Sequence, residues 1–127
     1  MTLNETLIEA RASLASWYED TDARGEEGLC NFICWQLEGQ HGAKVRMHLH
    51  NQGAMTMGSY VRRILFGSEK APNPSYEEPG GLVDSVTRAV RFMWLDAAIE
   101  ATKGSDTLPP LPTKGQVRRL AGQSEGS

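Results

Sequence analysis

Apolar residues recur at helical spacing in several stretches of this chain. The first stretch opens with Thr2-Leu3-Asn4-Glu5, a capping box in which side chains of the first turn satisfy backbone N–H groups. Its apolar stripe predicts an amphipathic helix over 3–19; the members are Leu3, Leu7, Ala10, Leu14 and Trp17. Similar stripes predict helices over 56–66 and 82–102. The longest stripe consists of Val83, Val86, Val90, Met93 and Ala97, and its apolar face is widened by Phe92, Trp94, Leu95, Ala98 and Ile99.

The segment from Gly28 to Leu37 is apolar on most of its circumference and carries both cysteines, Cys30 and Cys34. A helix that is apolar nearly all round is a buried one. We therefore expect a helix over 27–38 at the centre of the fold.

Residues 43–50 change period, because Ala43, Val45, Met47 and Leu49 alternate with polar residues. Strict alternation is typical of a half-buried strand. A strand needs a partner, and the rest of the chain offers none, so a short helical turn or an extended connector are the alternatives.

The composition changes after residue 104. Leu108-Pro109-Pro110-Leu111-Pro112 favours an extended polyproline conformation, and the last five residues are polar. These patterns predict a compact, mainly α-helical domain of about four helices over 1–104, followed by a flexible tail over 105–127. A short extended segment near 43–50 flanks the helices in this prediction.

Size and composition place the chain among soluble globular proteins. Its 127 residues suffice for one domain with its own core, and 39% are hydrophobic and 23% charged. No apolar run has the length of a membrane helix, and the N-terminal residues lack a signal sequence. We therefore expect a cytoplasmic protein that has no membrane partner and keeps its thiols reduced.

The net charge of −3 conceals blocks of opposite sign. Residues 1–42 hold eight acidic and two basic side chains, whereas residues 43–71 hold five basic and one acidic. Such blocks indicate a candidate binding face. Its expected members are Asp20, Asp22, Glu26, Glu27, Arg46, Arg62 and Arg63.

Three short motifs resemble a class of small bacteriophage proteins of unassigned function. They are Gly28-Leu29-Cys30, Pro74-Ser75-Tyr76, and the run from Arg88 to Leu95. The resemblance implies only a setting, a small protein that acts inside an infected bacterial cell.

The cysteines and histidines allow one metal hypothesis. Cys30 and Cys34 lie one helical turn apart, and His48 and His50 share a face if 43–50 is a strand. Four such side chains match a Cys2His2 zinc site. Buried packing is the favoured role of the cysteines, since free cysteine behaves as a small hydrophobe, and a redox pair is a further alternative.

The chain contains no phosphate-binding loop and no nucleophile elbow, so we expect no enzyme and no cofactor. The favoured function is protein binding, in which the chain modulates a larger host or phage assembly such as a bacterial defence or transcription complex. A zinc protein is one alternative. A nucleic-acid-binding modulator is another, in which Arg46, Arg62 and Arg63 contact phosphates and Tyr60 stacks on a base.

Overall fold

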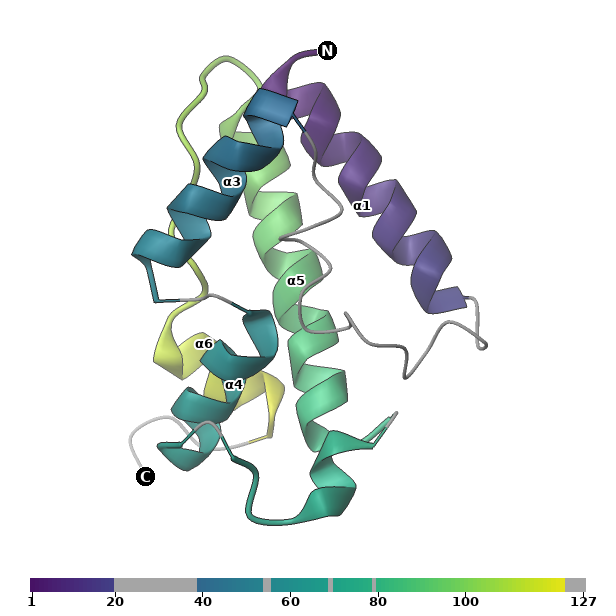
Figure 1. Cartoon of the computed structure of the whole chain (residues 1–127), viewed down its shortest axis with the longest axis vertical. Helices are drawn as coiled ribbons and strands as arrows, with labels where there is room; N and C mark the ends of the chain where they lie inside the picture. The colour runs from purple at the N-terminus through teal and green to yellow at the C-terminus, as the bar shows by residue number, and fades with distance from the viewer. Residues whose placement is uncertain (20–38, 54–55, 69, 79, 123–127) are drawn as a thin grey trace.

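The computed structural model describes residues 1–19, 39–53, 56–68, 70–78 and 80–122 (Figure 1). The described residues form helices and no strand, which confirms the mainly α-helical prediction. The elements are α1 (Leu3–Glu19), α3 (Gly39–Asn51), α4 (Met57–Phe66), the 3-10 helix η2 (Pro74–Glu77), α5 (Leu82–Ala101) and α6 (Lys114–Leu120).

Three predicted helices agree with the structure to within one residue. These are α1, α4 and α5, predicted over 3–19, 56–66 and 82–102. The predicted helix over 27–38, which carries Cys30 and Cys34, lies outside the described residues.

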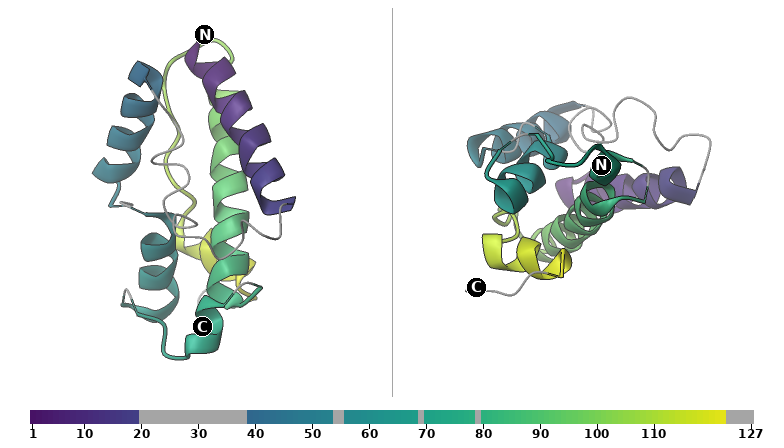
Figure 2. Two further views of the ribbon diagram at one scale, coloured as in Figure 1. Left: turned by 45° about the vertical axis from the view of Figure 1, so that its right-hand side comes forward. Right: turned by 90° about the horizontal axis from the view of Figure 1, so that it is seen from below.

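Helix α5 is the central element, and α1, α4, η2 and α6 all pack against it (Figures 1 and 2). Trp94, Leu95 and Ala98 of the predicted apolar face are buried, whereas Met93 is half-buried and Ala97 is exposed. Trp94 and Arg91 are the two largest fully buried side chains on the buried face of α5.

Helix α1 runs antiparallel to α5. The Asn4 side chain at its start donates hydrogen bonds to the Ile99 carbonyl (2.8 Å) and the Thr102 hydroxyl (3.1 Å) at the end of α5. Arg11 forms an ion pair with Asp96 halfway along the contact. The capping box is present as predicted: the Glu5 N–H donates to the Thr2 hydroxyl, and the Thr2 N–H donates to Glu5 Oε1.

Residues 43–50 belong to helix α3, so the predicted extended segment is wrong. Val45 and Leu49 lie one helical turn apart and are both buried, whereas Met47 between them is 60% exposed. In a strand the three side chains would share a face. The alternation therefore arose because one exposed methionine stands between two core positions of a helix.

Helix α4 begins and ends at residues suited to those positions. The Thr56 hydroxyl accepts from the Ser59 N–H at 3.1 Å and caps the first turn. Gly67 ends the helix with φ of 69°, a left-handed conformation that glycine adopts without strain. The ring of Phe66, the last residue of α4, stacks on the Tyr76 ring of η2 with centroids 5.8 Å apart and joins the two helices.

The chain after residue 104 packs into the same core, so the predicted flexible tail is wrong for residues 105–122. Leu108, Leu111 and Val117 are buried within the cluster that contains Trp94. Residues 105–113, which we call the strap, run without regular secondary structure from the end of α5 to α6. A capping box then starts α6, formed by Thr113 and Gln116.

Side chains of three helices hold the backbone of the strap. Trp94 Nε1 donates to the Pro109 carbonyl (3.1 Å), and His48 Nε2 donates to the same oxygen at 2.6 Å. The Tyr60 hydroxyl donates to the Pro112 carbonyl (2.6 Å). Because prolines lack an N–H and form no helix here, these side chains supply the partners that secondary structure would otherwise provide.

Candidate functional site

The clearest candidate site is a group of three helices that carries only positive charge. Helices α3, α4 and α6, hereafter the basic helices, contain no aspartate or glutamate. Their cations are Lys44 and Arg46 on α3, Arg62 and Arg63 on α4, and Lys114, Arg118 and Arg119 on α6. Helices α4 and α6 pack against each other, and the strap links them to α3.

The 3-10 helix η2 contributes Glu77, which pairs with Arg62 of α4, and the other acidic side chains of the described helices lie on α1 and α5. They are Glu5, Glu9, Glu19, Asp84, Asp96 and Glu100. In Figures 1 and 2, α1 lies across α5 from α4 and α6. The charge blocks of the sequence thus correspond to different helices of the fold.

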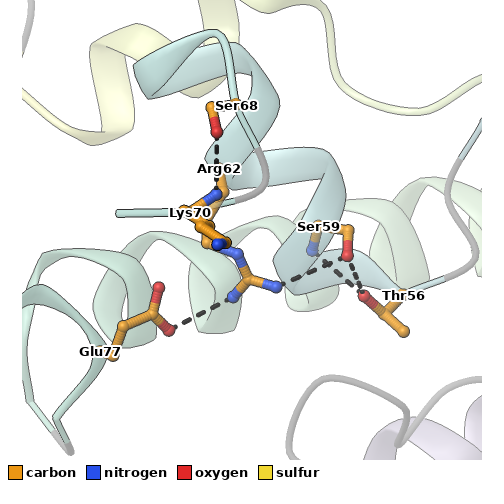
Figure 3. Close-up of polar contacts among 6 residues, drawn as sticks. All are labelled: Thr56, Ser59, Arg62, Ser68, Lys70 and Glu77. Carbon is orange, nitrogen blue, oxygen red and sulfur yellow. Dashed lines mark hydrogen bonds and ion pairs between the residues drawn. The ribbon is translucent and has the colours of Figure 1, made fainter. Parts of the chain in front are cut away.

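Arg62 is partly neutralised and holds local structure. Figure 3 shows its guanidinium between Glu77 of η2 (3.3 Å) and the Ser59 hydroxyl (3.5 Å). Its side chain is also largely buried. Arg62 therefore fixes η2 against α4 and is less suited than its neighbours to contact a partner.

Arg63 and Arg46 present their side chains at the surface. Arg63 donates a hydrogen bond to the Gly53 carbonyl in the turn before α4. Of the arginines expected at the binding face, these two are the exposed ones. The expected acidic members, Asp20, Asp22, Glu26 and Glu27, lie outside the described residues.

The cations of α6 are a part of the site that the sequence prediction missed, because residues 105–127 were expected to be flexible. Lys114 and Arg119 are exposed, and Arg118 is half-buried. The motif Thr113-x-x-Gln116 could have indicated the start of this helix, because it is a capping box directly before a basic turn.

Two exposed apolar side chains accompany the cations. Met47 on α3 is 60% exposed and lines a shallow hollow together with Lys44 and His48. Leu120 on α6 is 37% exposed and directly follows Arg119. Apolar side chains beside arginine are typical of protein–protein contact surfaces.

Tyr60, expected as a stacking ring, is not available for that purpose. It is half-buried, and its hydroxyl donates to Pro112. Burial raises the pKa of this phenol, while the nearby Arg63 lowers it to a smaller extent. Tyr60 therefore holds the strap in place.

The histidine pair of the zinc hypothesis does not have the geometry that the hypothesis assumed. In α3, His48 and His50 are two residues apart, so they point to nearly opposite sides of the helix. His48 contacts Pro109 and lies beside Trp94, whereas His50 is exposed. Within the described ranges, histidine, cysteine and carboxylate side chains form no metal-binding cluster. Cys30 and Cys34 lie outside those ranges, so their role stays a prediction.

Comparisons with protein-family models, with curated proteins and with solved structures find no match to this chain. The resemblance to phage proteins therefore stays a hypothesis. None of the helices in the described segments is both long and apolar enough to cross a membrane.

Proposed function

We propose that this protein is a non-catalytic modulator that binds an acidic surface of a larger protein assembly through its basic helices. The observation that supports the proposal is the separation of charge in the fold. Three helices carry cations without a single carboxylate, while the carboxylates of the described helices lie on α1, α5 and η2, whose Glu77 pairs with Arg62. Separated charge steers a protein to an oppositely charged partner and fixes its orientation on arrival.

A protein partner fits the surface better than a nucleic acid does. Met47 and Leu120 give the basic helices exposed apolar contacts, whereas Tyr60 is half-buried and its hydroxyl donates to Pro112. The whole chain is acidic, with a net charge of −3, so an extended polyanion would be repelled by α1 and α5. A compact acidic patch on a protein would contact the basic helices alone.

The setting that the sequence resemblance implies is the cytoplasm of a bacterial host. There, an assembly of the host or the phage, such as a defence or transcription complex, is the expected target. A modulator of this kind needs no cofactor, because its effect comes from covering a surface of the target.

The test combines partner capture with matched charge reversals. The tagged protein is used to isolate a stoichiometric partner from a bacterial lysate, and the affinity of that partner is then measured for two variants. Lys114→Glu/Arg119→Glu reverses exposed cations of α6, and Glu9→Lys/Glu19→Lys reverses exposed carboxylates of α1. We expect the first variant to weaken binding by about tenfold or more, roughly 1.4 kcal/mol, at unchanged melting temperature. The second variant should bind as the unchanged protein does.

Two results would contradict the proposal. Equal affinity of both variants would show that the basic helices are not the binding surface. Capture of nucleic acid in place of protein, with affinity that falls steeply as salt rises, would favour the nucleic-acid alternative on the same helices.

A further inference from the structure

Arg91 on α5 is a buried cation that uses only part of its hydrogen-bonding capacity. Its side chain is 0% exposed, and Nη1 donates to the Tyr18 hydroxyl at 2.7 Å. Nε and Nη2 are buried as well and have no hydrogen-bond partner in the described part of the chain. None of the ion pairs between described residues includes Arg91. A buried charge without such partners is strongly unfavourable, so this arrangement calls for a ligand.

The two nitrogens without partners form one edge of the planar guanidinium. Their N–H groups point in the same direction, and their spacing matches two oxygens of one carboxylate or phosphate group. Because Nη1 binds the Tyr18 hydroxyl, the edge formed by Nε and Nη2 remains. This edge can hold an oxyanion by two parallel hydrogen bonds.

Thr87 is a further buried donor on the same face of α5. It precedes Arg91 by one helical turn, so both side chains lie on the same face of α5. Thr87 is 4% exposed, and its hydroxyl also has no hydrogen-bond partner among the described residues. Two neighbouring buried side chains therefore both lack hydrogen-bond partners, and a single anion would provide acceptors for both.

Around Tyr18, two arginines outnumber one carboxylate, which favours a further negative charge. The Arg88 guanidinium lies over the Tyr18 ring, 4.7 Å from its centroid, so a second cation stands beside the first. Asp84, the carboxylate nearest in sequence on α5, is close enough to raise the pKa of the Tyr18 phenol, and it accepts a hydrogen bond from the Gly80 N–H at 2.8 Å. Burial raises the pKa of the Tyr18 phenol, although Arg91 lowers it in part, so this side chain stays neutral at pH 7.

We propose that Arg91 and Thr87 form a binding site for an oxyanion, a carboxylate or a phosphate group, between α5 and the C-terminal end of α1. This site is distinct from the basic helices and does not depend on the function proposed above. Arg91 is enclosed in the structure, so the groups that cover it must separate before an anion enters. Association is therefore slower than a diffusional encounter.

Thermal unfolding in matched solutions of sodium phosphate, sodium acetate and sodium chloride tests the site. At equal pH and ionic strength, a bound anion raises the melting temperature with a saturable dependence on its concentration. The ¹H–¹⁵N resonance of Arg91 Nε should shift over the same concentration range. A response to phosphate alone would assign a phosphoryl group, and a response to acetate would assign a carboxylate.

The variants separate this site from general salt effects. Arg91→Lys keeps the charge but lacks the two-nitrogen edge, and we expect it to weaken anion binding by about tenfold or more. Thr87→Val removes the third donor and should weaken binding to a smaller extent. Arg88→Lys, the same exchange at an exposed position of the same helix, should respond as the unchanged protein does.

Arg91→Met keeps the test decisive if the lysine variant is unstable. It removes both the buried charge and the hydrogen bond to Tyr18, two effects of opposite sign, so in chloride its melting temperature should stay close to that of the unchanged protein. An equal anion response in Arg91→Lys and the unchanged protein would overturn the proposal. A large loss of stability in Arg91→Met, together with no anion response in the unchanged protein, would overturn it as well. The guanidinium edge would then have its partner within the chain itself.

Discussion

Substitution of Leu111 by alanine tests whether the strap is part of the folded core. Leu111 is 6% exposed and belongs to the cluster around Trp94. Its backbone N–H donates to Gln52 Oε1 at 2.7 Å, and the substitution leaves that bond in place. The change therefore isolates the contribution of the apolar side chain.

The expected loss of stability is large. Truncation of a buried leucine costs about 2–5 kcal/mol, because the lost transfer free energy adds to the cost of the cavity. A domain of ordinary stability has about 5–15 kcal/mol in total. With a urea dependence of about 2 kcal/mol per molar, the unfolding midpoint should fall by roughly 1–2.5 M.

Urea unfolding followed by far-ultraviolet circular dichroism measures this shift. The matched control is Leu120→Ala, the same exchange at a position of α6 that is 37% exposed, and it should cost less than about 1 kcal/mol. Equal midpoints for the two variants and the unchanged protein would refute the packing of the strap against the core.

Three further predictions concern α3, η2 and the buried phenol. Val45→Asp should destabilise the protein by more than about 4 kcal/mol, because Val45 faces the core, whereas Met47→Asp should cost less than about 0.5 kcal/mol. Equal urea midpoints for the two variants would contradict the assignment of residues 43–50 to a helix. Gly81→Ala places a Cβ 2.5 Å from a backbone oxygen of η2 and should cost about 1–3 kcal/mol, whereas Gly104→Ala, with no atom within 4 Å, should be nearly neutral in thermal unfolding. Burial raises the pKa of Tyr18, so the unfolded chain loses this proton first and stability should fall as pH rises above about 10. In denaturation experiments at several alkaline pH values, Tyr18→Phe should reduce that fall in stability. An unchanged pH dependence would argue against a raised pKa of Tyr18.

The helices with a regular apolar stripe could be predicted from the sequence. Helices α1 and α4 follow from their spacing and caps, since Thr2 and Thr56 stand where a first turn needs acceptors. The bounds of α5 were also predictable, and so were most of its buried apolar residues. Trp94 occupies the core as part of the predicted apolar face, whereas Met93 of the same face is only half-buried.

The strap and α3 could not be predicted, because their structure depends on distant residues. Leu108, Leu111 and Val117 follow no helical or strand period, and they are buried only because other elements surround them. The prolines of this segment predicted an extended, flexible tail, but His48 and Trp94 both donate to the Pro109 carbonyl and hold it in place. Local pattern carries no information on such tertiary contacts.

The candidate sites were only partly visible in the sequence. The excess of positive charge in residues 43–71 indicated Arg46 and Arg63, but the cations of α6 stood in a segment expected to be flexible. Arg91 was also missed as a buried residue. Its spacing from Thr87, Leu95 and Ala98 gave a signal, because these positions lie one turn apart on the buried face of α5.

The division between basic and acidic helices also affects how copies of this protein meet. The α6 side of one molecule attracts the α1 side of another, and such a head-to-tail contact uses two different surfaces. Contacts of this type do not close on themselves as a symmetric dimer does, so they extend into open chains. At low ionic strength the protein would therefore associate progressively with concentration, whereas physiological salt, which screens charge beyond about 8 Å, would keep its molecules apart.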